Sequence, residues 1–544
     1  MKCFLITMAL CLPFFVYSQY KLPAVKTTAF KKDTVSIVKY SAVSDGITLN
    51  TKAFSSAIDE LSKKGGGVVL VPAGFWYTGP IRLKSNINLY LAAGALILFT
   101  SDKDQYPLVK ANWEGQPQMR CQSPVSAEDQ TNIAITGKGI IDANGDAWRS
   151  VKKDKLNETQ WKKLLGSGGV LSEDKKTWFP SEKYAKGNSI KDPGLLKPER
   201  DAAYYESVKD FFRPNMLVFT NCKRVLLEGV TFQNSPAWCL HPLLCEDLIV
   251  RNISVKNPWY AQNGDGIDLE SCRNVIIESS VFDVGDDGLC MKSGRDEEGR
   301  KRGRATENVT IRNCTVYAAH GGFVIGSEMS GGCRNINVTN CSFIGTDIGL
   351  RFKTTRGRGG VVENIYINNI WMKNIVGEAI LFDMYYMAKD PIPLAGEKRE
   401  LPAVEFKPVD ETTPVFRNFQ ISNVYCNGAA KAIFMRGIPE MHVKDITMQN
   451  MLLQADKGID IQESSNITLK NVKIFSKETS PVADIIQSEN ITIDGLGYPK
   501  NSELLIRISG DRSKEIKLLN TDTGNTKNKA LFELGATEKA LLIK

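Results

Sequence analysis

The chain has 544 residues, which is too long for one ordinary globular core and favours several domains or a repeat architecture. Hydrophobic residues make up 42% and charged residues 24%, as in soluble folded proteins. The net charge of +8 is compatible with an anionic partner. No RNP, zinc-finger or helix-turn-helix pattern supports nucleic acid, so a solvated basic surface is the simpler interpretation.

The first 18 residues predict a secretory signal peptide. Lys2 provides a short positive segment, and the apolar run CFLITMALCLPFFVYS that follows is too short to span a bilayer comfortably. Ser18 is a plausible residue for cleavage, whereas Leu10 before Cys11 disfavours a lipid anchor. We therefore expect an exported protein, periplasmic or extracellular, with no membrane partner.

Ten cysteines remain beyond this segment, and no pair has CxxC spacing, so zinc or redox chemistry has little support. Export would permit disulfides. Because several of these cysteines lie in apolar, strand-like contexts, we expect buried free thiols.

Residues 30–108 combine a helix-like pattern, NTKAFSSAIDELSKKGGG, with strand-like runs after it. A helix at this position would cap the open end of a repeat structure and protect its edge.

Residues 220–495 repeat a short theme, in which an asparagine or similar residue leads into alternating apolar positions, as in RNVIIESSVF, ENVTIRNCTV and RNINVTNCSF. Period-2 strands between Gly and Asn turns, without long helices, predict a parallel β-helix over residues 19–500. A propeller would need a more uniform period of about 40 residues, and a β-sandwich is the other alternative.

Three segments do not follow the repeat. Residues 149–212 are highly charged with few regular patterns, and residues 386–415 are Pro-rich. Both are expected to be long loops on one face, bordering a groove. Residues 501–544 alternate apolar and polar positions, which predicts strands that close or cap the solenoid.

Five functional side chains follow the phase of the repeat. In a solenoid, residues at matching positions stack about 4.8 Å apart. Asp286 and His320 each lie 11 residues after an apolar residue of consecutive repeats. Asp265 precedes Asp286 by 21 residues, about one coil, and Arg351 and Lys353 fall in the repeat after His320. We expect these five, together with Asp287, to form one cluster on consecutive coils.

The motif VGDDGLCMKSG (284–294) places Asp286 and Asp287 side by side between Gly285 and Gly288. Neighbouring residues of a strand point to opposite faces, so we expect the glycines to allow a bulge or turn that brings both carboxylates to one surface. Crowded carboxylates raise at least one pKa, so that one donates a proton while another activates water, as in glycoside hydrolysis. Inverting enzymes leave about 6.5–9.5 Å between acid and base. The nearby Arg and Lys would bind an acidic sugar.

Four motifs together resemble the polygalacturonases, glycoside hydrolase family 28. They are NGDGID (263–268), GDDGLCMKSG (285–294), HGGFVIGS (320–327) and RFK (351–353). The resemblance extends over about residues 37–495. It implies a right-handed parallel β-helix and hydrolysis of α-1,4 galacturonosyl bonds of pectic polysaccharides by inversion, with no metal or other cofactor.

Carried over by position, the resemblance assigns a role to each charged residue. It implies that Asp286 is the general acid and that Asp265 and Asp287 hold and activate the water. His320 would support protonation of the acid. The residues implied to bind substrate are Arg351, Lys353 and, from LFDMYY, Tyr385, although Tyr386 adjoins it.

Departures from the family motifs, at Gly264, Ala319 and Phe352, remove none of the assigned groups. SEMSGG (327–332) is similar to the exo-acting branch, and the long insertions could close one end of the groove. We therefore expect a monomeric exo-enzyme that releases galacturonic acid.

Other functions remain open: an endo-polygalacturonase, a rhamnogalacturonan hydrolase, a calcium-dependent lyase, or a non-catalytic carbohydrate-binding β-helix. The GDDG segment alone would more often be a solvated turn or a calcium site.

Overall fold

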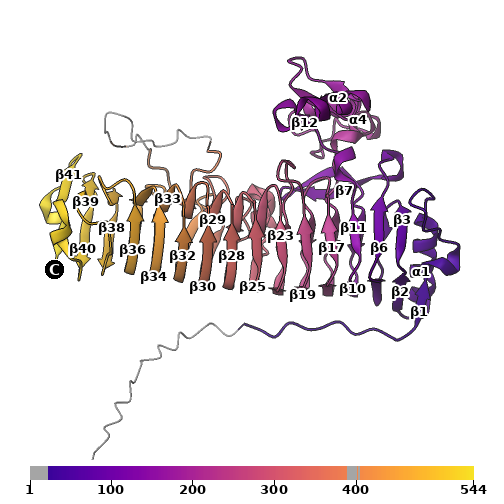
Figure 1. Ribbon diagram of the computed structural model, residues 1–544, viewed down its shortest axis with the longest axis horizontal. Helices are drawn as coiled ribbons and strands as arrows, with labels where there is room; N and C mark the ends of the chain where they lie inside the picture. The colour runs from indigo at the N-terminus through magenta and orange to yellow at the C-terminus, as the bar shows by residue number, and fades with distance from the viewer. Residues whose placement is uncertain (1–21, 389–400, 402–404) are drawn as a thin grey trace, which may run out of the picture.

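The computed structural model describes residues 22–388, 401 and 405–544, so the predicted signal peptide lies outside the described residues. The chain winds into a long parallel β-helix (Figure 1), as the repeat predicted. A typical coil contributes three strands before the next coil begins at β24 (Asp287–Lys292): β21 (Ile267–Glu270), β22 (Arg273–Glu278) and β23 (Val281–Asp283).

One strand of each coil joins a 14-stranded sheet, here called the site sheet, in which neighbours pair in parallel. Its strands, in order, are β4 (Ile81–Arg82), β9 (Val125–Glu128), β15 (Leu217–Thr220), β18 (Leu240–Leu243), β21, β24, β27 (Gly321–Ile325), β29 (Ile348–Lys353), β31 (Glu378–Asp383), β33 (Lys431–Arg436), β35 (Lys457–Gln462), β37 (Ala483–Ile486), β39 (Ser502–Ser509) and β41 (Thr526–Glu533).

The remaining strands of the solenoid form a 23-stranded sheet, which begins as two rows. The first row is β1 (Thr34–Ser36), β2 (Gly67–Val71), β5 (Ile87–Leu91), β10 (Thr131–Gly137), β16 (Lys223–Glu228), β19 (Glu246–Arg251), β22 and β25 (Thr306–Arg312). The second is β3 (Gly74–Thr78), β6 (Ala95–Phe99), β11 (Ile140–Asp142), β17 (Thr231–Gln233), β20 (Ser254–Lys256), β23 and β26 (Thr315–Tyr317).

Both rows merge at a single long strand, β28, which pairs with β25 and with β26. The sheet continues as β28 (Cys333–Ile344), β30 (Val361–Lys373), β32 (Val415–Asn427), β34 (Val443–Ala455), β36 (Ser464–Ser476), β38 (Glu489–Asp494), β40 (Lys514–Leu519) and β42 (Leu541–Ile543). Strands β39 to β42 thus extend both sheets over the C-terminal residues.

The asparagine of each repeat has a structural reason. Asn308, Asn335 and Asn364 all have φ near +56°, the left-handed conformation that asparagine tolerates better than most residues. Their side chains form a ladder from coil to coil: the Asn335 amide donates to the Asn308 Oδ1 at 3.2 Å, and the Asn364 amide donates to the Asn335 Oδ1 at 3.0 Å. The repeated residue therefore turns the chain and links adjacent coils.

The interior is a continuous apolar core in which side chains of equal phase stack. Phe352 and Phe382 lie on neighbouring coils with ring centroids 4.5 Å apart, and Phe419 packs edge-on against both at 5.0 Å. The ten cysteines of the described residues are buried and free, as expected from their apolar contexts.

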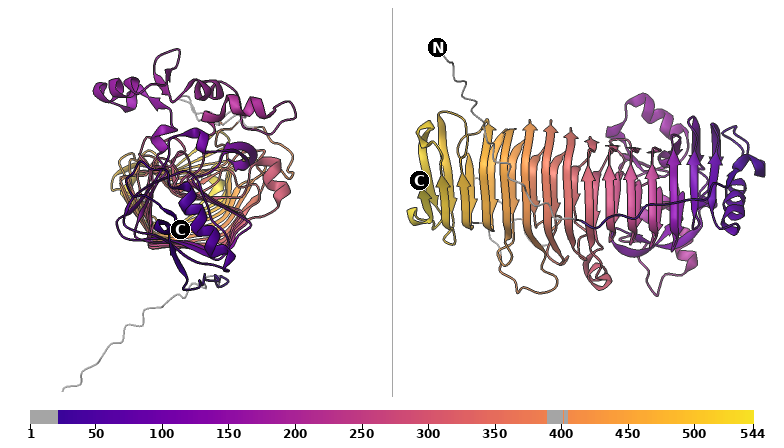
Figure 2. Two further views of the ribbon diagram at one scale, coloured as in Figure 1. Left: turned by 90° about the vertical axis from the view of Figure 1, so that its right-hand side faces the viewer. Right: turned by 90° about the horizontal axis from the view of Figure 1, so that it is seen from below.

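The N-terminal end of the solenoid is covered by α1 (Thr51–Lys63), which confirms the predicted capping helix (Figure 2). Its inner face buries apolar residues, among them Phe54 and Leu61. Covering the end protects core side chains that the first coil would otherwise expose.

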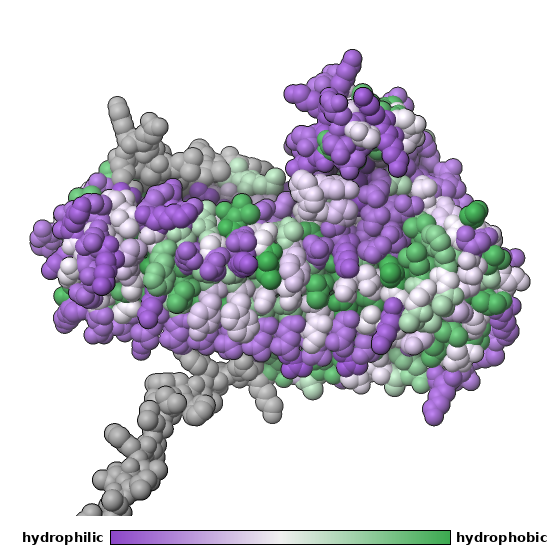
Figure 3. All heavy atoms as spheres, viewed as in Figure 1, coloured by the Kyte–Doolittle hydropathy of each residue, from purple (hydrophilic) through white to green (hydrophobic). Residues whose placement is uncertain are grey.

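Residues 149–212, here called the insert, differ from the irregular loop that their composition predicted. They stand above the solenoid (Figure 1) and present a mostly hydrophilic surface (Figure 3). Asn157, Ser181 and Asp201 each cap a short helix by accepting a backbone hydrogen bond. The strands and α-helices of the insert are β12 (Val151–Lys152), α2 (Glu158–Gly166), β13 (Val170–Leu171), β14 (Thr177–Phe179), α3 (Glu182–Asn188) and α4 (Ala202–Ser207).

Candidate active site

Four neighbouring strands of the site sheet, β21, β24, β27 and β29, bring the predicted residues together. Ile267 pairs with Leu289, so Asp265, two residues earlier, lies opposite Asp287. The spacing of 21 residues had instead predicted Asp286 as its neighbour. His320 is the partner of Asp286, because its backbone N–H donates to the Asp286 carbonyl at 2.9 Å.

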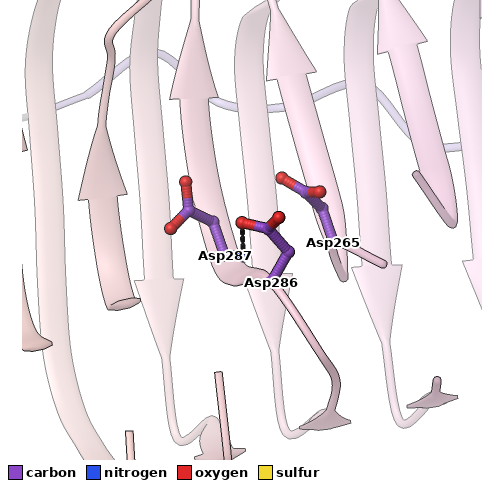
Figure 4. A group of neighbouring side chains, drawn as sticks. All are labelled: Asp265, Asp286 and Asp287. Carbon is purple, nitrogen blue, oxygen red and sulfur yellow. Dashed lines mark hydrogen bonds between the residues drawn. The ribbon is translucent and has the colours of Figure 1, made fainter. Parts of the chain in front are cut away.

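All three carboxylates project from the same face of the strands (Figure 4). One oxygen of each lies within 4.8 Å of an oxygen of the other two. The Asp286 carboxylate also accepts the backbone N–H of Asp287 at 2.9 Å, which fixes its direction. Asp265 and Asp287 are 3% and 1% exposed.

Glycines make this arrangement possible. A Cβ on Gly288 would lie 2.5 Å from the Val316 side chain, so the chain must approach the core there without a side chain. A Cβ on Gly285 would meet the Pro258 carbonyl oxygen at 2.4 Å. The chain therefore bends inward on both sides of the Asp pair, and both carboxylates face outward.

Two cations hold Asp287. Lys353 Nζ lies 2.7 Å from one carboxylate oxygen, and Arg351 Nη1 lies 3.2 Å from the other. Burial alone would raise the pKa of Asp287, but the Lys353 ammonium and the Arg351 guanidinium outweigh it and hold that pKa well below its usual range. Asp287 is therefore ionised, and both predicted carboxylate binders already contact an anion of the protein.

His320 connects the site to solvent. Its Nδ1 lies 3.2 Å from Asp286 Oδ1, its Nε2 lies 3.7 Å from Asp347, and its side chain is 49% exposed. The hydrogen bond to Asp286 raises the pKa of His320, although partial burial opposes this. The imidazole therefore lies beside Asp286, the outermost of the three carboxylates.

Asp265 lies in the opposite environment. Burial, Asp268 and Asp286 all raise the pKa of Asp265 well above its ordinary value. Its Oδ1 is buried and has no hydrogen-bond partner within the described residues. An unpartnered oxygen at this position is suited to hold a water molecule or a substrate hydroxyl.

Behind the cluster lies a group of buried charges that the sequence analysis did not identify. Lys292 Nζ lies 2.8 Å from Glu328 and 3.6 Å from Asp268. Burial would raise the pKa of Glu328, but Lys292 and Arg358 lower it to about 2. The lysine stood in the quoted motif, but its partners lie a coil away and carry no local signal.

Tyr385, predicted to bind substrate, is 2% exposed and belongs to the core. Its ring lies beside Arg436 and Arg356, not beside Arg351 and Lys353. The neighbouring Tyr386 lies closer to them, with its ring centroid 4.7 Å from Lys353 Nζ and 5.5 Å from the Arg351 guanidinium.

A hairpin of β7 (Leu108–Trp113) and β8 (Gln116–Cys121) crosses the site sheet towards the segment after β24. The Gly115 carbonyl accepts the Arg295 N–H at 3.2 Å. Trp113 stacks on Trp238 with centroids 5.8 Å apart. His241, on β18 of the site sheet, is fully buried and lies 2.8 Å from Glu270.

In the basic segment 294–307, two of the arginines bind groups of the protein itself. The segment contains α5 (Asp296–Arg302), from which Arg302 pairs with Glu270 at 2.6 Å and Arg300 donates to the Gly357 carbonyl at 2.7 Å.

The carboxylate cluster could in principle hold a metal ion, since Asp265, Asp286 and Asp287 each offer an oxygen. The positive charge at Asp287 is already supplied by Arg351 and Lys353. Hard cations such as calcium need more oxygen ligands than these three.

A parallel β-helix whose outer face carries an acidic cluster with adjacent cations has the equipment of a glycoside hydrolase. The model of the glycosyl hydrolases family 28 matches residues 203–427. A hyperthermoactive exopolygalacturonase from Thermotoga maritima shares 32% identity and a TM-score of 0.63, over 79% of this chain and 89% of that one. The chain belongs to family 28 of the glycosyl hydrolases.

Two further relatives agree with this assignment. A probable polygalacturonase of Vitis vinifera is 30% identical over 352 residues, which are 63% of this chain and 61% of that protein. An exo-poly-α-D-galacturonosidase of Dickeya chrysanthemi is 26% identical over 488 residues, or 86% of this chain and 72% of that one. In the part of the chain that the structure describes, no helix is long and apolar enough to cross a membrane.

Proposed function

We propose that the protein is an exo-acting polygalacturonase, which hydrolyses α-1,4 galacturonosyl bonds and releases galacturonic acid from chain ends. The observation that carries this proposal is the cluster itself: three carboxylates within 4.8 Å, one of them held by Arg351 and Lys353. The relatives named as exo-acting enzymes support the direction of attack.

In the proposed reaction, Asp286 donates its proton to the glycosidic oxygen while the bond from that oxygen to the anomeric carbon breaks. Water held by Asp265 and Asp287 attacks the same carbon and passes its proton to this pair. The family resemblance assigns Asp286 as the acid, and it is the most accessible of the three carboxylates, with 23% of its side chain exposed. His320 then holds Asp286 in position, 3.2 Å away.

Arg351 and Lys353 have two tasks in this proposal. They keep Asp287 ionised, and they offer their remaining N–H groups to the carboxylate of the galacturonosyl residue next to the bond. Tyr386, which covers both cations, would form the side of that subsite in place of Tyr385.

Inversion rests on the family resemblance and not on the spacing of the carboxylates. One oxygen of each carboxylate lies within 4.8 Å of the others, which is closer than the roughly 6.5–9.5 Å usual for inverting enzymes. In this site, however, the water would lie against two carboxylates instead of one. Proton NMR of the first product distinguishes the outcomes: the β-anomer indicates inversion, and the α-anomer indicates retention.

Exo action is supported by the β7–β8 hairpin. Its tip is held against Arg295 by the Gly115 carbonyl and by the Glu114 carboxylate at 3.4 Å. A groove blocked there would admit only the end of a chain. We further propose that the protein is exported and acts as a monomer; cell fractionation and light scattering test these two points.

Product analysis on defined linear oligogalacturonides tests the function. We expect galacturonic acid alone from the earliest times; mixed oligomers would indicate an endo-enzyme. Cleavage of rhamnogalacturonan only would place the protein in that branch. An unsaturated, ultraviolet-absorbing product that disappears with EDTA would identify a lyase, and binding without cleavage would identify a carbohydrate-binding protein.

A further inference from the structure

A pocket of about 600 Å³ lies beside His320, and no step of the proposed reaction needs it. One wall is the beginning of the insert, with Lys152 and Lys155. The opposite wall is the turn that carries Trp259 and Tyr260 before Asp265. Its volume is in the range of ordinary small-ligand sites.

The position of the pocket relative to the strands determines what can enter it. The pocket is lined by turns that precede the strands of the site sheet: Gly285 comes before β24, Ala318 before β27 and Asp347 before β29. The cations and Asp287, in contrast, lie on the strands themselves. A substrate chain that passes over the acid, before β24, and the cations, on β29, therefore crosses these neighbouring strands, with the row of turns and the pocket at its side.

The lining of the pocket is suited to a sugar. Trp259 is 59% exposed, more than Trp371 at 46%. Lys155 Nζ lies 4.7 Å from its ring centroid, and the Tyr260 ring stands nearly perpendicular to it at 5.8 Å. Aromatic faces pack against the apolar faces of sugar rings, and lysines donate hydrogen bonds to hydroxyls.

The wall formed by the insert is anchored. Val151 pairs with Trp178 of β14, and Ser150 is within 3.5 Å of Gln262 on the facing turn. The two walls therefore meet at one end of the pocket, which makes it a formed site and not an open surface.

We propose that this pocket binds a sugar branch carried by a galacturonosyl residue next to the bond that is cleaved. The inference rests on the proposed function, because it names the substrate class of the same site: branched galacturonan in place of the plain homopolymer. Trp259 is the stacking platform for the branch, and Lys152 and Lys155 bind its hydroxyls.

The test compares linear oligogalacturonides with oligogalacturonides of the same length that carry single xylosyl branches. For the unaltered protein we expect kcat/KM to be about tenfold or more higher on the branched set, which corresponds to about 1.4 kcal/mol. In Trp259→Ala this preference should fall towards one. Trp371→Ala is the matched control, because Trp371 is 46% exposed on β30, in the other sheet, and should retain the full preference.

Several results would overturn the inference. One is hydrolysis of the linear set with rejection of the branched set, which leaves the proposed function intact. Another is an equal loss on both sets in Trp259→Ala, which would make the pocket a subsite of the main chain. Hydrolysis of neither set would instead refute the proposed function. Calorimetric titration of Asp286→Asn with both sets separates binding from turnover, and equal affinities would also contradict the inference.

Discussion

The asparagine ladder and the active site use the same stacking of coils with opposite consequences. In the ladder, Asn308, Asn335 and Asn364 each donate to one neighbour and accept from the next, so identical neutral groups satisfy one another. In the site, the same stacking brings the carboxylates of Asp265 and Asp287 together. Two groups of like charge repel and cannot satisfy one another as amides do. A row of amides is stable by repetition, whereas a row of carboxylates needs positive charge, which Arg351 and Lys353 supply from two coils further on.

The largest expected effect is the loss of activity when Asp286, in the carboxylate cluster, is replaced. Asp286→Asn keeps the shape of the side chain but removes its proton donor, so kcat should fall by about 10²–10⁴-fold. Initial rates on linear oligogalacturonides measure this, and circular dichroism should show an unchanged fold. A variant with more than a tenth of the original rate would exclude Asp286 as the acid.

The next largest effect is expected at Lys353, the cation that stabilises the buried Asp287. Lys353→Met leaves Asp287 buried beside Arg351 alone, and removing one partner of a buried ion pair costs about 3–5 kcal/mol. Urea denaturation should show this loss. Adding Asp287→Asn should restore a large part of it; a double variant no more stable than the single one would mean that the loss comes from packing.

A smaller effect of opposite sign is expected at Asp265, whose raised pKa means that folding favours its protonated form. Because the folded protein binds this proton more tightly, it gains stability that is fully present below the ordinary carboxyl pKa. That stability is lost as the pH rises through the raised pKa of Asp265 in the folded protein. Asp265→Asn should therefore be more stable than the original protein near pH 7, by about 1.4 kcal/mol per unit of pKa shift, and inactive.

The gain in stability of Asp265→Asn should vanish near pH 3.5, which thermal unfolding at several pH values can follow. The exposed Asp154→Asn is the matched control and should show no such gain. A gain that is independent of pH would show that the effect is not due to ionisation.

The smallest effect is expected in the ladder. Asn335→Ala removes two hydrogen bonds and places an alanine, which disfavours the left-handed conformation, at φ 56°. The variant should lose about 1–3 kcal/mol of stability without a change in activity. Asn335→Gly loses the same bonds but tolerates this φ, so it should be the less destabilised of the two. An equal loss in both would mean that the left-handed conformation contributes nothing.

The sequence predicted the solenoid because each coil repeats the same local rules: alternating apolar residues and an asparagine at the turn. It also predicted which charged residues meet, because their spacing follows the coils. It did not predict contacts that join distant segments. The Gly115 to Arg295 hydrogen bond has no local signal, and neither does the burial of Lys292 with Glu328.

The positions of Tyr385 and Tyr386 could not be predicted for a different reason. Strand β31 ends at Asp383, so the alternation that places side chains inside or outside stops before Tyr385 and Tyr386. The capped helices of the insert were also missed, although Asn157, Ser181 and Asp201 stood in the sequence. Their helices are too short to produce an apolar period.

The attachment of the insert has a consequence for divergence. Arg149, at its start, donates to the Ser235 carbonyl, and Arg213, just after its end, donates to the Pro236 carbonyl at 2.9 Å. Both junctions are therefore fastened to one short stretch of a single coil. Because both ends of the insert are attached at one place, the insert can change in length or be replaced while the coils below keep their register. Selection, or a designer, can thus retarget the enzyme without rebuilding the part that breaks the bond.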